Sequence, residues 1–271
     1  MAGLLPSLLR MPATCAVCLA NAAVCALLYT RGVPPEDVAL SYRRFVKERQ
    51  FWRAITSSFS HYSLLHLVFN VAAVYNLGSL ETRKGTLYYL RATVLLLLTC
   101  DCLAMAIYHV LIKFAHTTPH TTPHTAPHNT KHETKDRVLG RRELKDAYAV
   151  GYSGVAFGLM AIEAAQSPSG RMSVFGRAVP AVAAPFASLL VTQVIVPNAS
   201  FTGHLAGIVA GFVLAAGALD WFGTAAMLEV LLWGGVALVW SLKTSSRLPM
   251  GWVVLEDDAP RSLIIENGVA R

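Results

Sequence analysis

Residues 147–165 read AYAVGYSGVAFGLMAIEAA. This stretch is apolar except for a serine near its start and one acid near its end, and its length is close to the roughly 20 residues that cross a ~30 Å hydrocarbon core as a helix. A second stretch, FTGHLAGIVAGFVLAAGAL, residues 201–219, has the same character. These segments predict helices that span a membrane, and each carries polar residues near its start.

The composition of the whole chain agrees with this interpretation. Of its 271 residues 54% are hydrophobic and 14% are charged, whereas soluble domains are about a quarter charged. The mean hydropathy is +0.47. We therefore expect an all-α polytopic membrane protein. By apolar length and polar flanks, the spans are expected at about 12–29, 62–80, 92–112, 147–165, 178–197 and 201–219, with an added span at 222–242.

The net charge of +7 does not indicate nucleic-acid binding. The basic residues lie mainly in loops between apolar runs, where they contact lipid headgroups. The bilayer is thus one expected partner. Charge leaves the orientation of the N-terminus open. The remaining polar parts are an N-terminal tail at 1–11 and a C-terminal tail at 243–271.

Residues 115–146 form an insert rich in His, Thr and Pro. His116, His120, His124, His128 and His132 recur every fourth residue, and intervening prolines disfavour a helix. Regularly spaced histidines can bind a transition metal. No Cys or acid cluster completes such a site, so a tether is the favoured interpretation and we expect no metal site in the protein.

Candidate catalytic residues stand at the starts of two spans. Gly151 and Gly154 flank Ser153, so another backbone or a substrate can approach it closely. His204 adjoins the first glycine of a G-x-x-x-G-x-x-x-G face formed by Gly203, Gly207 and Gly211. Small-residue faces let membrane helices touch. The two helices can therefore bring a serine to a histidine.

A third element adds hydrogen-bond donors. His66 and Asn70 lie one helical turn apart on one face of the second span. A serine hydrolase needs donors directed at the oxyanion of its tetrahedral intermediate. A single Asn in a membrane helix often only joins helices, but the pair favours the catalytic interpretation.

At these residues the sequence resembles the rhomboid family of intramembrane serine proteases, over roughly residues 50 to 215. Within that family it is most similar to the eukaryotic endoplasmic-reticulum branch. The family motifs occur in order as Trp52-Arg53, H-x-S-L-x-H-x-x-x-N from His61 to Asn70, E-x-R-x-G from Glu81 to Gly85, G-x-S-G from Gly151 to Gly154, and G-H-x-x-G-x-x-x-G from Gly203 to Gly211.

The resemblance implies a six-helix rhomboid core and a Ser–His dyad. Ser153 is then the nucleophile and His204 the general base and acid, with no third acid. Phe157 occupies the aromatic position expected to pack on the imidazole. His66, Asn70 and the Ser153 amide are implied as the oxyanion hole.

The resemblance also assigns supporting residues. His61 lines the water-filled cavity. Glu81 and Arg83 form a structural hydrogen-bond network, and Trp52 and Arg53 brace the first loop. Asp101 matches no motif; we expect it to face the bundle and to have a partner, because an intramembrane acid is costly.

These residues imply an endopeptidase that cleaves other membrane proteins within or near their spans and needs no cofactor. Single-span substrates whose helices unwind easily are favoured, because a peptide bond in a helix is hidden and hydrogen-bonded. An escort factor that binds clients without cleaving them is the alternative. A transporter is disfavoured because no motif has a second copy. The expected location is the endoplasmic reticulum or another secretory membrane, with mitochondrial and plasma membranes left open.

Overall fold

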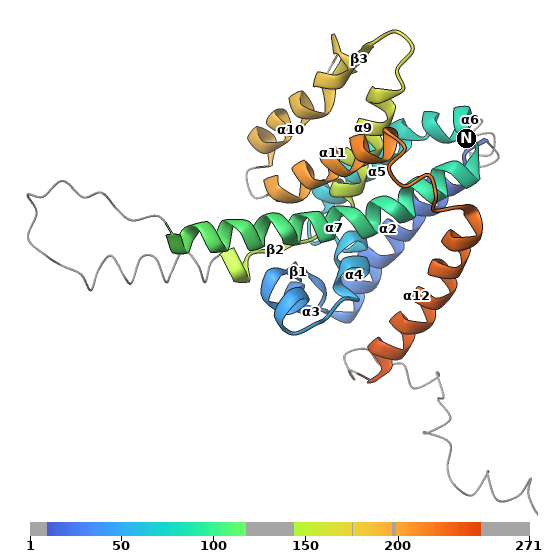
Figure 1. Cartoon of the computed structure of the whole chain (residues 1–271). Helices are drawn as coiled ribbons and strands as arrows, with labels where there is room; N and C mark the ends of the chain where they lie inside the picture. The colour runs from blue at the N-terminus through green and yellow to red at the C-terminus, as the bar shows by residue number, and fades with distance from the viewer. Residues whose placement is uncertain (1–9, 118–143, 175, 197–198, 245–271) are drawn as a thin grey trace, which may run out of the picture. The chain divides into compact units, whose positions relative to one another are not determined.

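The computed structural model describes residues 10–117, 144–174, 176–196 and 199–244 (Figure 1). Most of the 115–146 insert, most of the N-terminal tail and the C-terminal tail beyond residue 244 lie outside these ranges. The chain divides into two units, Met1–Thr224 and Ala225–Arg271. Each is described by itself.

The first unit is built from helices, with two short sheets. Its α-helices are α2 (Pro12–Arg31), α3 (Pro35–Val38), α4 (Arg53–Phe59), α5 (Leu64–Leu77), α6 (Ser79–Lys84), α7 (Thr86–Thr117), α9 (Ser153–Ala165), α10 (Ala184–Ile195) and α11 (Phe201–Ala215). A π-helical turn covers Arg43–Lys47 and a 3-10 turn covers Ala181–Ala183. β1 (Leu40–Ser41) pairs antiparallel with β2 (Tyr148–Ala149), and β3 (Arg171–Val174) with β4 (Arg177–Pro180). In the second unit, α12 (Thr224–Thr244) is a single apolar helix.

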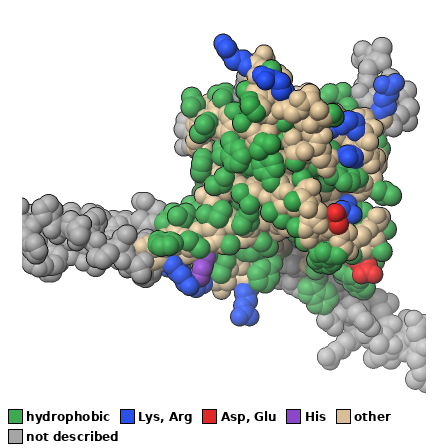
Figure 2. All heavy atoms as spheres, turned by 45° about the horizontal axis from the view of Figure 1, so that its top comes forward, with side chains coloured by type: hydrophobic (Ala, Val, Ile, Leu, Met, Phe, Trp, Pro, Cys, Tyr) green, Lys and Arg blue, Asp and Glu red, His purple; other side chains and the backbone are tan. Residues whose placement is uncertain are grey.

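Several of the described helices are apolar, and some are long enough to be membrane spans. Within the described ranges, three stretches are long and apolar enough to cross a bilayer: Pro12–Arg31, Leu64–Lys84 and Thr86–Phe114. Shorter apolar helices cover Ser153–Ala165, Ala181–Ile195, Phe201–Ala215 and Thr224–Trp240. Figure 2 shows hydrophobic side chains over much of the visible face, with Lys and Arg mainly near its margins. The fold is that of a polytopic all-α membrane protein.

Two expected spans begin later as helices than the sequence predicts. Of residues 147–165, the helical part starts at Ser153, because β2 is extended and Gly151 has a φ of +113°. Of residues 178–197, the first three belong to β4, and α10 starts at Ala184. Apolar length alone does not reveal these extended entries, because their residues are as apolar as those of the helices.

Other boundaries differ at glycines and helix ends. The span expected at 62–80 comprises α5 and α6, which meet at Gly78. The span expected at 92–112 lies inside α7, whose 32 residues extend for about 48 Å at 1.5 Å per residue. This exceeds a ~30 Å hydrocarbon core. α11 ends at Ala215, shortly before Gly217, which has a φ of +81°.

Glu81 fixes the start of α2. Its carboxylate accepts hydrogen bonds from the backbone amides of Ala13, at 3.0 Å, and Thr14, at 2.8 Å, and from the Thr14 hydroxyl at 2.7 Å. Helix N-termini leave their first amides without intrahelical acceptors, and the N-cap residue Met11 supplies no side-chain acceptor. Glu81 meets this need from another helix and also accepts from Thr86.

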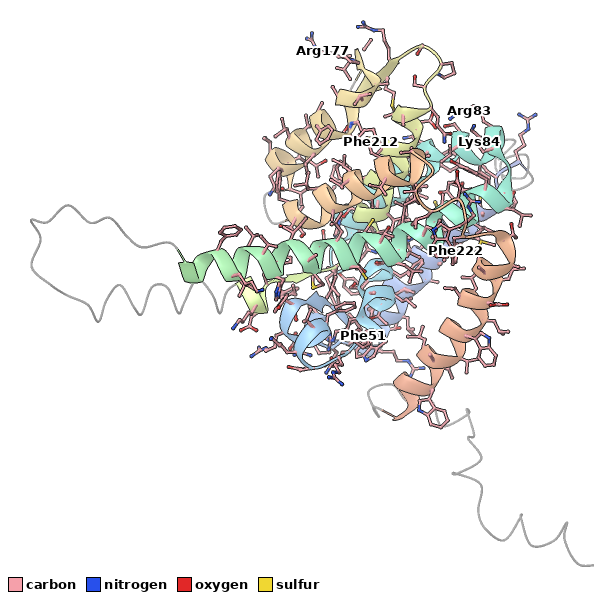
Figure 3. All side chains as sticks on the ribbon, viewed as in Figure 1. Phe51, Arg83, Lys84, Arg177, Phe212 and Phe222 are labelled. Atoms are coloured by element: carbon pink, nitrogen blue, oxygen red, sulfur yellow. The ribbon has the colours of Figure 1, made fainter. Side chains whose placement is uncertain are left out.

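Arg53 organises the first loop. Its side chain is fully buried and donates to the carbonyls of Glu36, at 3.0 Å, and Ala39, at 2.7 Å. Its guanidinium also lies 4.6 Å from the ring centre of Trp52. The buried carbonyl of Ala39 thereby gains a donor. Figure 3 shows Phe51, beside this motif, at the opposite end of the first unit from Arg83, Lys84 and Arg177.

Candidate active site

The centre of the site is a contact between Ser153 and His204. The serine is the first residue of α9, and the histidine is the fourth of α11. Ser153 Oγ lies 2.8 Å from His204 Nε2, which is hydrogen-bond distance. The histidine is 3% exposed, and its Nδ1 has no hydrogen-bond partner among the described residues. When the imidazole carries its proton on Nδ1, the serine hydroxyl donates to Nε2.

Glycines bring the two helices together. A Cβ added at Gly207 would lie 2.1 Å from the carbonyl oxygen of Gly154, and one at Gly211 would lie 2.2 Å from that of Gly158. Side chains larger than hydrogen cannot occupy either position at this separation. The backbones of α9 and α11 therefore touch directly, and this contact holds the serine and histidine in register.

Phe157 packs against the imidazole. The two ring centres are 4.6 Å apart and the planes are inclined by 33°. Phe157 lies one turn after Ser153 on α9, and it is 7% exposed. The ring restricts the rotation of His204 by packing on its face, whereas soluble serine proteases hold the imidazole with a carboxylate bonded to Nδ1.

The backbone before Ser153 is tied to the first loop. β2 pairs with β1, and the amide of Gly151 donates to the carbonyl oxygen of Ser57 at 2.8 Å. Gly151 then turns with its φ of +113°, a conformation that L side chains rarely adopt. The sequence pattern gave no indication of this link to Ser57, because the acceptor is a main-chain atom.

His66 and Asn70 approach this turn from α5. A Cβ added at Gly151 would lie 2.5 Å from His66 Cε1, 2.8 Å from His66 Nε2 and 3.3 Å from Asn70 Nδ2. Gly151 is thus required both by its φ and by these side chains. The structure brings the three residues together immediately before Ser153.

His61 orients the Asn70 amide. His61 Nδ1 lies 3.2 Å from the Phe59 carbonyl oxygen, and Nε2 lies 2.9 Å from Asn70 Nδ2. Burial, with the neighbouring His66, lowers the pKa of His61 to about 4, so the ring is neutral at neutral pH. A carbonyl only accepts, so Nδ1 carries the proton and Nε2 accepts from Asn70. One Asn70 hydrogen remains for another acceptor.

Two cavities reach the serine and histidine. One of about 360 Å³ is lined by residues that include Ser153, His204, Gly203 and Asp101. The other, of about 500 Å³, is lined by α5, α9 and α10 residues and also includes Ser153 and His204. Both cavities thus adjoin the serine hydroxyl and the imidazole. Among the described residues no group of three or more His, Cys, Asp or Glu side chains could hold a metal ion.

The remaining expected residues take structural positions. Arg83 pairs with Glu163 of α9 and not with Glu81, so the two motif residues serve separate contacts. The expectation of a partner for Asp101 is not met at Oδ2, which is buried without a hydrogen-bond partner among the described residues. An acid amid apolar residues was the only sequence signal for that position.

The geometry is that of a polytopic helical membrane protein in which a half-buried serine and a buried histidine meet at the starts of two helices. A family model described as the Rhomboid domain matches residues 48–221. The chain belongs to the rhomboid family.

Curated relatives agree with this assignment. Rhomboid-like protein 15 of Arabidopsis thaliana is 34% identical over 60% of this chain and 36% of its own length. Rhomboid-like protein 14, mitochondrial, of the same plant is 44% identical over 27% of this chain and 21% of its own. Human Rhomboid-related protein 4 is 26% identical over 69% of this chain and 52% of its own. The chain thus spans between about a fifth and a half of these relatives.

Proposed function

We propose that this protein is an intramembrane serine endopeptidase that cleaves other membrane proteins within or beside their spans. The observation that carries the proposal is the 2.8 Å contact between Ser153 Oγ and His204 Nε2. Family membership supports a protease-like role. The catalytic roles of the individual residues are part of the proposal.

The proposed reaction begins when Ser153 Oγ attacks the carbonyl carbon of the scissile bond and its proton passes to His204 Nε2. The carbonyl oxygen becomes an oxyanion. The Ser153 amide, at the first turn of α9, has no intrahelical acceptor and can donate to it. His66 and the second hydrogen of Asn70 supply further donors.

Collapse of the intermediate breaks the C–N bond, and His204 returns the proton to the leaving amine. Water then attacks the acyl-enzyme: His204 takes its proton, and Ser153 leaves with that proton restored. Phe157 holds the imidazole through both proton transfers. Neither a metal nor a cofactor enters these steps.

The proposed substrates are single-span proteins with helices weakened by Gly, Pro or polar residues. A helical peptide bond must unwind before Ser153 can reach its carbonyl carbon, and such residues lower that cost. We also propose the endoplasmic-reticulum membrane as the location, on the similarity of the G-Y-S-G and G-H segments to that branch. Imaging of a fluorescent fusion against organelle markers tests the location.

The test of the function is cleavage by protein reconstituted into liposomes with a labelled single-span substrate. Ser153→Ala and His204→Ala should abolish cleavage, and a fluorophosphonate probe should label the unaltered protein but not Ser153→Ala. Ser169→Ala, in an exposed turn, is the matched control that should keep both activities. Substrate binding without cleavage by the unaltered protein would instead establish an escort factor.

A further inference from the structure

One acid, Asp101, lines a cavity that the proposed nucleophile also lines. Asp101 lies in α7, and it lines the 360 Å³ cavity together with Ser153 and His204. No step of the proposed reaction uses it. An ionisable residue inside a membrane protein that faces a cavity marks a functional position by default.

The packing of α7 on α9 fixes the level of Asp101. Leu96 of α7 contacts the position of Gly158, and Cys100 Sγ lies 3.8 Å from the carbonyl oxygen of Gly154. The step from Leu96 to Cys100 along α7 thus matches the step from Gly158 back to Gly154 along α9. Asp101 follows Cys100, so it stands beside the Gly154 level, on the side toward the segment that precedes Ser153.

The Asp101 carboxyl group has no Lys or Arg partner among the described residues that line its cavity. Its Oδ2 is buried and lacks a hydrogen-bond partner among the described residues. Among those residues the cavity lining contains no Lys or Arg and no other acid, and its remaining polar side chains belong to Ser, His, Tyr and Cys. Buried polar groups are normally paired, and each exception calls for an explanation. The partner of this acid can come from a substrate.

We propose that Asp101 is a specificity-determining residue that binds a Lys or Arg side chain of the substrate near the scissile bond. This inference rests on the proposed function for its substrate class. A cationic side chain supplies hydrogen-bond donors together with a positive charge, which no described residue of the cavity lining carries as Lys or Arg. The same side chain weakens a membrane helix, because charge is costly in hydrocarbon. One residue would thus mark a span as easy to unwind and fix its position at the site.

The test compares substrates that differ only by Lys or Met at one position, scanned through the four residues on either side of the scissile bond. Dissociation constants are measured with Ser153→Ala protein in liposomes, and kcat/KM with the active protein. At one or two adjacent positions Lys should be favoured roughly 10-fold to 100-fold, the range for hydrogen bonds to charged groups. In Asp101→Asn that ratio should fall to about one, and Asp101→Glu should restore part of it.

A ratio between two substrates does not depend on how much protein is folded, so a general loss of stability cannot imitate this result. Asp220→Asn, which removes a carboxyl group paired with Arg91 outside the cavity, should keep the full preference. Equal binding of the Lys and Met substrates at every position, or a preference that survives Asp101→Asn, would overturn the inference. Preferential binding of the Lys substrate without any cleavage would support the role of Asp101 and refute the proposed proteolysis. Cleavage of both substrates with equal efficiency would support proteolysis and refute the role of Asp101.

Discussion

Gly207→Ala should separate the serine from the histidine without removing either. The added Cβ would lie 2.1 Å from the Gly154 carbonyl oxygen, whereas ordinary contacts begin at 3.4 Å. The obstacle is backbone, so α9 and α11 must move apart by roughly 1 Å. The same movement would lengthen the 2.8 Å contact between Ser153 and His204 to nearly 4 Å, beyond hydrogen-bond distance.

The expected cost to catalysis is about 100-fold or more in kcat, since proton transfer by a positioned base contributes ~10²–10⁴ and a 1 Å misplacement can cost ~10². Overpacking should lower the free energy of unfolding by only about 1–3 kcal/mol. The assay is cleavage of one labelled substrate in liposomes, with circular dichroism to verify helix content.

Gly234→Ala in α12 is the matched control, because an added Cβ there meets nothing within 4 Å among the described residues. It should cleave at the normal rate. Turnover by Gly207→Ala within threefold of the unaltered protein would refute the argument that direct backbone contact sets the geometry of the serine and histidine.

Three further predictions concern the surroundings of the site. Asn70→Ala should lower kcat by roughly 10²–10³ with the fold intact, the loss typical of one oxyanion donor; unchanged kcat would remove Asn70 from that role. Glu81→Gln should lower the free energy of unfolding in detergent by about 1–3 kcal/mol, because charge-assisted bonds to the first turn of α2 are weakened. As the pH is lowered from 6.5 to 4, the protein should become less stable and its unfolding midpoint should decrease. In this range unfolded His61 binds a proton that the folded residue, with its pKa of about 4, does not. His61→Gln should reduce that slope, and equal slopes would contradict the assignment.

The fold class and the family could be predicted from sequence because apolar length and motif order are local properties of the chain. The structure confirms an all-α polytopic protein, and the Rhomboid domain match confirms the family. Two helices, α9 and α10, begin later than the apolar stretches that predict the spans. Hydrophobicity reports burial in lipid or protein, and the non-helical residues 147–152 and the β4 residues 178–180 are as apolar as the helices that follow them.

The parts of the site that sequence could not supply are those made by main-chain atoms and by distant pairs. The Gly151 amide bonds the Ser57 carbonyl oxygen, and any residue type at position 57 offers the same oxygen. The partners of Arg83 and Glu81 lie on helices far away in sequence, so the E-x-R spacing suggested one network where there are two. Asp101 was visible as an unusual acid, but its cavity was not.

Close packing takes the place of an orienting carboxylate in this arrangement. A triad acid holds its imidazole by a hydrogen bond to Nδ1, and His204 Nδ1 has no such bond among the described residues. Its orientation depends instead on the Phe157 ring and on the contact of α11 with α9 at Gly207. Packing restricts rotation but supplies no charge to stabilise imidazolium, so proton transfer should be sensitive to small helix displacements. Substitutions at helix contacts away from the dyad should therefore reduce kcat more than they reduce stability.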